Sequence, residues 1–300
     1  MRETIKKKMT PEGLKNIYFI GIGGIGMSAL ARYFKQLGKN VSGYDRTETE
    51  LTRHLVSEGI AVHYTDDVNL VDAAVLQSPL NTAIVYTPAV PKDHKELNYL
   101  RDKGYTLYKR AEILGKITNE TYTIAVGGTH GKTTTSCLVT HLLRHANIGC
   151  GAFLGGISVN FDSNFVLPEP DAIKAITVTE ADEFDRSFLH LTPDIAVITS
   201  MDADHLDIYG KHESLLQSFF FFAQKVKPGG TMYLRYGNQL NGDLTGIHVK
   251  TYGLGDGADY HAANITIDSG SYYFDLVTPV NSYLKLKLGI PGIHNVENAV

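Results

Sequence analysis

The sequence has 300 residues, of which 43% are hydrophobic and 20% charged, so it has enough apolar material for a sizeable core. This composition excludes disordered, collagen-like and fibrous proteins, and the length predicts two domains at roughly 100–200 residues each. The formal net charge is 28 − 32 = −4, which gives the chain as a whole no electrostatic reason to bind nucleic acid.

The redox and targeting signals favour a reducing, intracellular location. Cys137 and Cys150 are too few for a disulfide framework or a thiolate metal cage. The basic N-terminus is not followed by an apolar stretch of signal-peptide length, and no run of about 18 apolar residues occurs. We therefore expect a soluble, cytoplasmic chain that has no membrane partner.

The first part of the chain alternates between apolar runs and amphipathic segments. The run IYFI leads into GIGGIGM, an amphipathic stretch and NVSGYD, which predict a strand, a turn, a helix and a strand. The alternation continues to a helix expected at DHKELNYLRDKG. After an N-terminal tail at 1–13, this pattern predicts a Rossmann-like, doubly wound α/β domain over residues 14–118.

A second strand, glycine loop and helix begin after the polar segment TNETY. The strand TIAV runs into GGTHGKTTT, and further buried strands are expected at 172–179 and 195–200. After a helix around 213–227, the turn signal KPGG introduces short, hairpin-spaced β segments. We expect a P-loop-type α/β ATP-binding domain over residues 119–300, with an antiparallel β extension.

Two features near the end of the chain are unusual. Four consecutive aromatic residues at Phe219–Phe222 cannot share one helix face, so they predict a helix buried on more than one side or, alternatively, an interface. The closing PGIHNVENAV predicts a turn and the start of a helix capped by Asn295. A helix that stops at its first turn is not a natural ending, and we expect a fragment.

The strongest chemical signal is a loop between a predicted strand and a predicted helix. It comprises Gly128, Thr129, His130, Gly131, Lys132, Thr133 and Thr134. Backbone N–H groups and the helix N-terminus of such a loop bind phosphate, Lys132 can reach the β- and γ-phosphates, and Thr133 can bind Mg²⁺. Val126 replaces the first glycine of the full Walker pattern, so only the GxxGK[ST] core matches. The loop predicts a nucleoside triphosphate site.

A second phosphate-binding pattern is the GxGxxG turn near the N-terminus. The contacts are expected from Gly21, Gly23, Gly24, Ile25 and Gly26. Asp45 ends the next strand 19 residues after Gly26, where its carboxylate can accept hydrogen bonds from ribose hydroxyls. The turn predicts pyrophosphate binding, although a purely structural glycine turn stays open. The motif does not distinguish NAD, FAD and a nucleotide sugar.

Acidic residues follow the strand expected at 172–179. Glu180 lies nearest to the strand end and is the expected Mg²⁺ ligand. Asp182, Glu183 and Asp185 are either further participants or partners of a helix N-terminus. The sequence does not decide which of these three carboxylates has a direct role.

Histidines provide the remaining candidates. His205, in DADHLD, follows a third predicted parallel strand, and the convergence of strand ends predicts a metal or substrate ligand. One imidazole among oxygen donors favours Mg²⁺ or Mn²⁺ over Zn²⁺. His130 lies inside the phosphate loop, and His190, in SFLHLTP, is a candidate for substrate binding.

Taken in order, these motifs resemble those of the Mur ligases of peptidoglycan synthesis. The resemblance runs from Asn16 to the last residue, through GIGGIGM, KRAEILG, GTHGKTTT, EADEFDRSFLHLTP, DADHLDIYG and PGIHNVENA. It implies that the first domain holds UDP-N-acetylmuramate and that the second binds ATP·Mg²⁺. The implied catalytic residues are Lys132 on the phosphates, Glu180 with Thr133 on one ion, and His205 on a second ion. Asn295 and His294 match the position that recognises adenine.

The activity implied by the resemblance is ATP-dependent amide formation. L-Alanine would be joined to the lactyl carboxylate of UDP-N-acetylmuramate through an acyl phosphate. A relative that attaches a recycled tripeptide to the same sugar nucleotide is the alternative, disfavoured because that branch differs around the glycine turn and His205. The family's C-terminal domain would be absent here. An NAD-dependent oxidoreductase or a P-loop ATPase would each explain one domain only, and the oligomeric state stays open.

Overall fold

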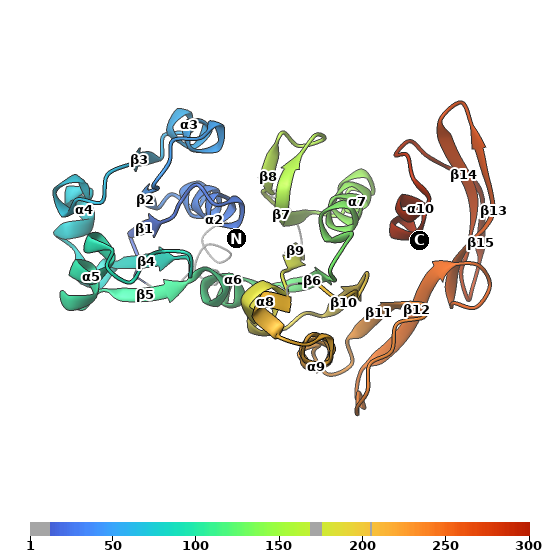
Figure 1. Cartoon of the computed structure of the whole chain (residues 1–300). Helices are drawn as coiled ribbons and strands as arrows, with labels where there is room; N and C mark the ends of the chain where they lie inside the picture. Colours follow the sequence, from blue (N-terminus) through green and yellow to red (C-terminus); the bar gives the residue numbers. More distant parts are fainter. Residues whose placement is uncertain (1–12, 169–175, 205) are drawn as a thin grey trace. The chain divides into compact units, whose positions relative to one another are not determined.

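The computed structural model describes residues 13–168, 176–204 and 206–300 (Figure 1). The chain divides into two compact units. The first comprises Met1–Thr121 and Gly151–Ala172, and the second comprises Tyr122–Cys150 and Ile173–Val300. Both units contain a parallel sheet with helices, which confirms the predicted α/β class. Within the described ranges, no helix is long and apolar enough to cross a membrane.

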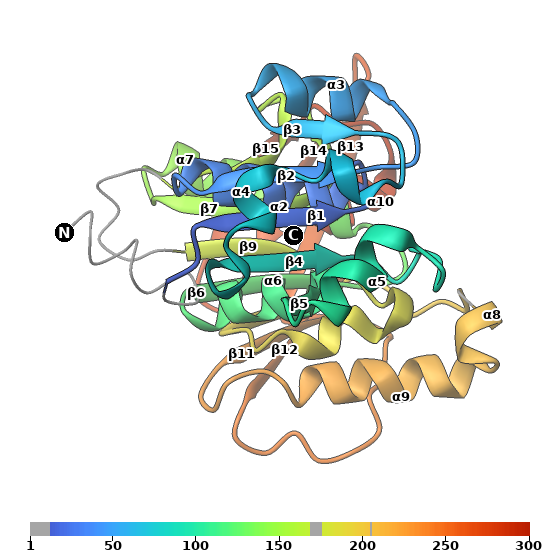
Figure 2. The ribbon, with the colours of Figure 1, turned by 90° about the vertical axis from the view of Figure 1, so that its left-hand side faces the viewer.

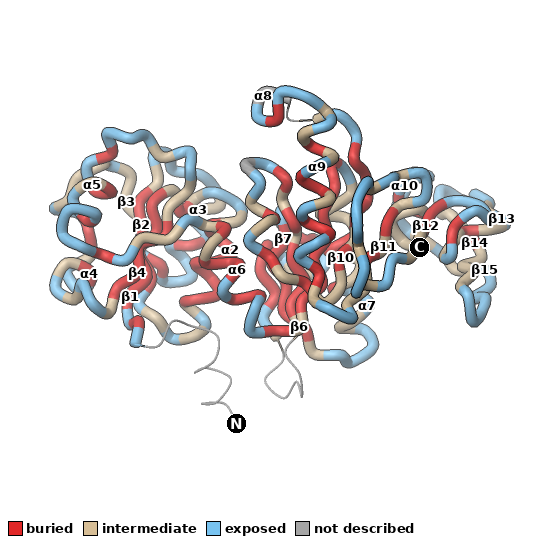
Figure 3. Tube along the Cα trace, turned by 90° about the horizontal axis from the view of Figure 1, so that it is seen from below, coloured by how far each residue is buried: buried red, intermediate tan, exposed pale blue. Residues whose placement is uncertain are grey.

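The first unit is built on a five-stranded parallel sheet in the order β3-β2-β1-β4-β5. The strands are β1 (Asn16–Ile20), β2 (Asn40–Tyr44), β3 (Ala61–His63), β4 (Thr82–Tyr86) and β5 (Thr106–Lys109). Every residue of β1 is buried, as expected of a central strand covered on both faces (Figure 3). The strand order reverses at β1, and the carboxyl ends of strands at such a switch point are where open α/β sheets bind ligands.

Helices cover both faces of this sheet. They are α2 (Ile25–Gln36), α3 (Glu50–Ser57), α4 (Ala73–Leu76), α5 (Lys95–Asp102) and α6 (Arg110–Asn119), with 3₁₀ turns η1 (Val68–Leu70) and η2 (Pro79–Asn81). Figures 1 and 2 show α2 and α6 on one side of the sheet and α4 and α5 on the other. The architecture is therefore the doubly wound fold that the alternating pattern predicts.

A β-hairpin that the sequence reasoning did not predict packs on α2. It consists of β7 (Cys150–Ser158) and β8 (Ser163–Val166). The Asn164 amide donates to Ser28 Oγ at 2.9 Å, and its side-chain oxygen accepts a hydrogen bond from Arg32. Because the hairpin covers a second side of the helix, eight consecutive residues of α2 are buried. The segment GAFLGGIS was overlooked because its glycines interrupt the apolar alternation of a strand.

The sheet of the second unit runs in the order β15-β14-β13-β12-β11-β10-β6-β9. The strands are β6 (Tyr122–Gly127), β9 (Ile176–Ala181), β10 (Ile195–Ile198), β11 (Thr231–Arg235), β12 (His248–Leu254), β13 (Tyr260–Asp268), β14 (Ser271–Val277) and β15 (Ser282–Leu288). β6 pairs in parallel with both β9 and β10, so the three strand ends lie at one edge as predicted.

The antiparallel extension is confirmed for β13–β15 and is wrong for β11 and β12. β13 pairs antiparallel with β14, and β14 with β15. β11 and β12 instead pair in parallel with each other, and β11 also pairs in parallel with β10. The connection at residues 236–247 is long enough to return the chain to the start of the next strand, as parallel pairing requires.

The helices of the second unit follow the glycine loop and the acidic segments. They are α7 (Lys132–His145), α8 (Leu206–Tyr209), α9 (His212–Ala223) and α10 (Ile293–Ala299), with the 3₁₀ helix η3 (Phe184–His190). In α9, Phe219 and Phe222 are fully buried, whereas Phe221 is 45% exposed. The fully buried residues of α9 follow one face at helical spacing. Phe220 lies off that face and is half-buried with its ring against Gly242, so the phenylalanine run is covered on more than one side although Phe221 is exposed.

A buried polar network lies inside the core of the first unit. The Tyr18 hydroxyl donates to Glu96 Oε2 at 2.6 Å and lies 2.8 Å from His63 Nε2. The Asp67 N–H donates to Glu96 Oε1 at 3.1 Å. The Glu96 side chain is 0% exposed, and burial raises the pKa of its carboxyl to about 7. Glu96 therefore changes its charge close to neutral pH.

We expect Glu96→Gln to alter how stability depends on pH. Because the folded-state pKa lies above the ordinary value of 4.5, the stabilising contribution is complete below pH 4.5 and is lost as the pH rises through 7. This pKa difference corresponds to roughly 3 kcal/mol at most. Chemical denaturation at pH 5 and pH 8 should show the variant gaining stability relative to the unsubstituted chain at the higher pH. The exposed Glu48→Gln is the control, and parallel pH profiles for all three proteins would contradict the expectation.

Candidate functional site

The phosphate loop of the second unit is held in place by the residues that follow β10. The Thr129 N–H donates to the Ser200 carbonyl at 3.1 Å, and the His130 N–H donates to Ser200 Oγ at 2.8 Å. Gly128 passes so close that a Cβ atom there would lie 2.1 Å from Thr199 Oγ1. The neighbouring parallel strand therefore fixes the loop backbone. Ser200 was not singled out from the sequence, although its position directly after a predicted strand was the available signal.

The loop turns into α7 at Gly131. This residue has φ = 86°, a left-handed conformation that favours glycine, and it is the N-cap of the helix. Lys132, Thr133 and Thr134 then form the first helical turn, where the two threonines are half-buried. The backbone thus presents the N-terminus of a long helix at the loop, as an anion-binding loop requires.

Helix α10 brings an asparagine to this loop. A Cβ atom on Gly131 would lie 2.8 Å from Asn298 Oδ1. The prediction that Asn295 caps the helix is wrong, because Gly292 is the N-cap and Asn295 lies inside the helix. The buried Asn295 amide donates to the Pro291 carbonyl at 2.6 Å, and the exposed His294 lies beside Gly292. Asn298, three residues after Asn295 on the same helix, was missed by the sequence reasoning.

Lys132 pairs with a carboxylate from the acidic segment after β9. Its Nζ lies 2.8 and 3.0 Å from the two carboxylate oxygens of Glu183 and donates to the Gly128 carbonyl at 2.7 Å. Glu183 is 0% exposed, and the Lys132 side chain is 17% exposed. The structure therefore connects the phosphate loop to the acidic segment through Glu183, one of the residues that the sequence left undecided.

The other members of the acidic segment have different surroundings. Glu180 is half-buried at the end of β9, in register with Val126 of β6. Asp182 Oδ1 accepts the Phe184 N–H at 3.0 Å, which supports the start of η3. His190 is exposed at the end of η3. The side chain of Asp185 lies outside the described part of the structure.

A metal site cannot be assembled from the described residues alone. His205 lies outside the described residues. Among the described residues, no three His, Cys, Asp or Glu side chains are grouped closely enough to hold a metal ion. The Thr133 hydroxyl and the Glu180 carboxylate are nevertheless oxygen donors of the kind that Mg²⁺ prefers. The role of these residues stays a prediction.

The glycine turn of the first unit is tied to β2. The N–H groups of Gly21 and Ile22 donate to the Tyr44 carbonyl at 2.8 and 3.0 Å. The Gly23 N–H donates to Asp45 Oδ2 at 2.7 Å, so the carboxylate expected at the ribose contacts the turn itself. Gly24 is the N-cap of α2 and makes no side-chain capping bond. The Asp45 carboxylate therefore stabilises the conformation of the glycine turn.

An arginine that the sequence reasoning did not select lies at the start of α2. The Arg110 guanidinium is packed against Gly26, where a Cβ atom would lie 2.7 Å from Nη1. Ile25 begins the helix, and its carbonyl accepts from Ser28 Oγ at 2.9 Å. Arg110 belongs to the segment KRAEILG, and its position at the first residue of α6 was the available signal.

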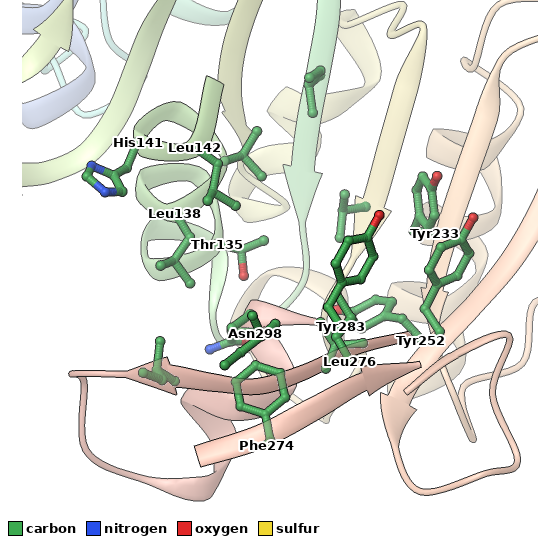
Figure 4. A pocket seen from close by; sticks show the side chains of 18 of the residues that line it. Thr135, Leu138, His141, Leu142, Tyr233, Tyr252, Phe274, Leu276, Tyr283 and Asn298 are labelled. Carbon is green, nitrogen blue, oxygen red and sulfur yellow. The ribbon is translucent and has the colours of Figure 1, made fainter. Parts of the chain in front are cut away.

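A separate cavity of about 670 Å³ lies in the second unit (Figure 4). Its lining is mostly apolar and comes from α7, α10 and the sheet. Figure 4 shows Leu138 and Leu142 of α7 on one side and Tyr233 and Tyr252 on the other. None of the sequence-predicted site residues is among the lining residues. Asn298, which lies beside Gly131, is one of them, so the cavity adjoins the phosphate loop at that residue.

Comparison with known proteins gives close relatives in sequence. The chain is 51% identical over 287 residues to the UDP-N-acetylmuramate–L-alanine ligase of Christiangramia forsetii and 50% identical over 289 residues to that of Porphyromonas gingivalis. Each alignment covers 96% of this chain. It covers 61% and 62% of the two relatives, so the chain spans about three fifths of their length.

Solved structures share the fold. The UDP-N-acetylmuramate–alanine ligase of Thermotoga maritima matches with a TM-score of 0.78 and 27% identity, over 94% of this chain and 62% of that one. The UDP-N-acetylmuramate:L-alanyl-γ-D-glutamyl-meso-diaminopimelate ligase of Neisseria meningitides matches with a TM-score of 0.82 and 25% identity, over 95% and 90%.

The family assignment covers both units. Residues 16–122 match the catalytic domain of the Mur ligase family, and residues 126–300 match the Mur ligase middle domain. The two glycine loops described above fall one in each match. The chain therefore belongs to the Mur ligase family.

Proposed function

We propose that this chain forms the sugar-nucleotide and ATP sites of a ligase that joins L-alanine to UDP-N-acetylmuramate. The observation that carries the proposal is the presence of two phosphate-type glycine loops in one chain, the second of which has Lys132 at its helix start. Relatives at 44–51% identity bear this activity in their names. The tripeptide-adding alternative is supported by a more distant likeness to a solved structure, at 25% identity.

The first unit would bind the UDP part of the sugar nucleotide. Backbone N–H groups at Gly24, Ile25 and Gly26 begin α2, where the helix dipole favours a diphosphate. Asp45 lies at the end of the neighbouring strand, where a carboxylate can accept ribose hydroxyls. Arg110 would add a fixed positive charge beside Gly26.

The second unit would bind ATP. The N–H groups of the loop from Gly128 to Thr134 and the Lys132 ammonium would hold the phosphates. Asn295 and Asn298 of α10 offer amide groups for adenine, with Asn298 beside Gly131. Thr133 and Glu180 would hold one Mg²⁺ ion and His205 a second, and these ions would neutralise charge on the phosphates when bound.

The proposed chemistry is activation of a carboxylate followed by attack of an amine. A lactyl carboxylate oxygen would attack the γ-phosphorus of ATP, and the bond from that phosphorus to the ADP oxygen would break. The L-alanine amine would then attack the acyl phosphate, forming the amide and releasing phosphate and a proton. This chain's residues would position the reactants and balance their charge, which supplies most of the catalysis in phosphoryl transfer.

Lys132→Ala is expected to weaken ATP binding while leaving UDP-N-acetylmuramate binding nearly intact. Removal of one charge-assisted hydrogen bond, about 1.5–3 kcal/mol, lowers affinity roughly 10- to 100-fold. Isothermal titration of each ligand separately measures this. Lys227→Ala is the matched control, because Lys227 pairs with Asp194 just before β10, at the opposite edge of the same sheet. Equal loss of both ligands in the folded Lys132 variant would refute the assignment.

Asp45→Asn is expected to weaken UDP-N-acetylmuramate binding and to leave ATP binding intact, the opposite of Lys132→Ala. The asparagine oxygen can still accept the Gly23 N–H, but the charge that strengthens bonds to ribose hydroxyls is lost. Affinity for UDP-N-acetylmuramate should fall about tenfold, with ATP affinity unchanged. Asp72→Asn, at the opposite edge of the first sheet beside Asn40, should bind both ligands normally. Unchanged sugar-nucleotide binding by the Asp45 variant would remove Asp45 from the site.

A further inference from the structure

The ammonium group of Lys132 is fully engaged inside the protein. A lysine has three N–H donors, and Nζ has three acceptors within 3.0 Å: two oxygens of Glu183 and the carbonyl of Gly128. A phosphate oxygen that approaches Lys132 must therefore replace or share one of these bonds. The lysine expected to hold phosphates already has an anionic partner.

Glu183 is itself held firmly in this position. The Tyr209 hydroxyl, from α8, donates to the Glu183 backbone carbonyl at 2.5 Å. Tyr209 is only 5% exposed, and the Arg186 guanidinium lies 5.5 Å from the centre of its ring. The acidic segment and the DADHLDIYG segment therefore meet at Glu183. The carboxylate is not a solvated side chain that can simply move away from Lys132.

The burial of Glu183 makes its pairing with Lys132 energetically important. A fully buried carboxylate that loses its cation is strongly destabilising, whereas neutralising both partners leaves no uncompensated charge. The same carboxylate repels phosphate groups brought to the same ammonium. These two effects give the carboxylate a measurable influence on polyphosphate binding.

We propose that Glu183 is a positioning residue that holds the Lys132 ammonium at the loop and competes with nucleotide phosphates for it. The inference rests on the proposed ATP site. Nucleotide binding then exchanges at least one hydrogen bond of Lys132 from a protein oxygen to a β- or γ-phosphate oxygen. The competition lowers affinity for polyphosphate and leaves a nucleotide with only an α-phosphate unaffected.

The test is the affinity of Glu183→Gln for ATP, ADP and AMP, measured by isothermal titration without divalent cations. Glutamine keeps the shape and one acceptor oxygen but removes the charge. We expect ATP and ADP to bind about tenfold more tightly than to the unsubstituted chain, and AMP to bind equally. Asp194→Asn, which removes the carboxylate of another lysine pair in the same unit, should leave all three affinities unchanged.

A second measurement needs no ligand. Lys132→Met should destabilise the protein by removing the cation that pairs with the buried Glu183 carboxylate, and the double variant Lys132→Met/Glu183→Gln should recover most of that loss. If Glu183→Gln alone does not fold, Tyr209→Phe keeps both charges but removes the bond to the Glu183 backbone. Its ATP-to-AMP affinity ratio should rise in the same direction by a smaller factor.

The outcomes separate the two proposals. The proposal that Glu183 competes with phosphates for Lys132 is overturned if folded Glu183→Gln binds ATP with unchanged or weaker affinity. It is also overturned if the affinities for ATP and AMP change equally. In both cases the proposed ATP site stands. Additive stability losses in the double variant also overturn the competition, because they exclude the pairing. Failure of the folded, unsubstituted chain to bind ATP, with or without Mg²⁺, overturns the proposed function and this inference together.

Discussion

The parallel pairing of β6 with a strand on each side is the constraint on which the second unit depends. It forces the chain segments after β6, β9 and β10 to one edge of the sheet. The phosphate loop, Glu183 and Ser200 meet there for that reason alone, although they lie far apart in sequence. The hydrogen bonds from Thr129 and His130 to Ser200 then give the loop a fixed shape. The position of the Lys132 ammonium follows from this backbone arrangement, because Lys132 is the first residue of the helix that the loop begins.

Each unit fixes its glycine turn with a hydrogen-bond acceptor from the neighbouring strand, but the two acceptors differ in charge. In each, a glycine turn leads from a central strand into a long helix, and the neighbouring strand supplies the group that fixes the turn. In the first unit this group is the Asp45 carboxylate, which accepts the Gly23 N–H. In the second it is the Ser200 hydroxyl, which accepts the His130 N–H. A neutral hydroxyl beside the second loop adds no negative charge where a triphosphate is expected.

Much of the fold was predictable because parallel α/β units carry a strong local signal. The glycine turns and their flanking helices follow from residue pattern alone, and the meeting of the ends of β6, β9 and β10 at one edge follows from their parallel direction. Contacts between distant segments were not predictable in the same way. The pairing of Lys132 with Glu183 rather than Glu180, and the approach of Asn298 to Gly131, depend on how 3₁₀ and α-helices begin after the strands. The hairpin β7–β8 escaped notice because its glycines weaken the strand pattern.

That hairpin has a consequence for how the chain can be divided into pieces that fold. Residues 151–168 lie between two stretches of the second unit in sequence, yet they pack as part of the first. The second unit is therefore discontinuous, and neither unit can be cut out as a single uninterrupted stretch without loss. A piece beginning after α6 would carry the hairpin without α2, and would expose Phe153 and Phe165, which pack on Tyr33.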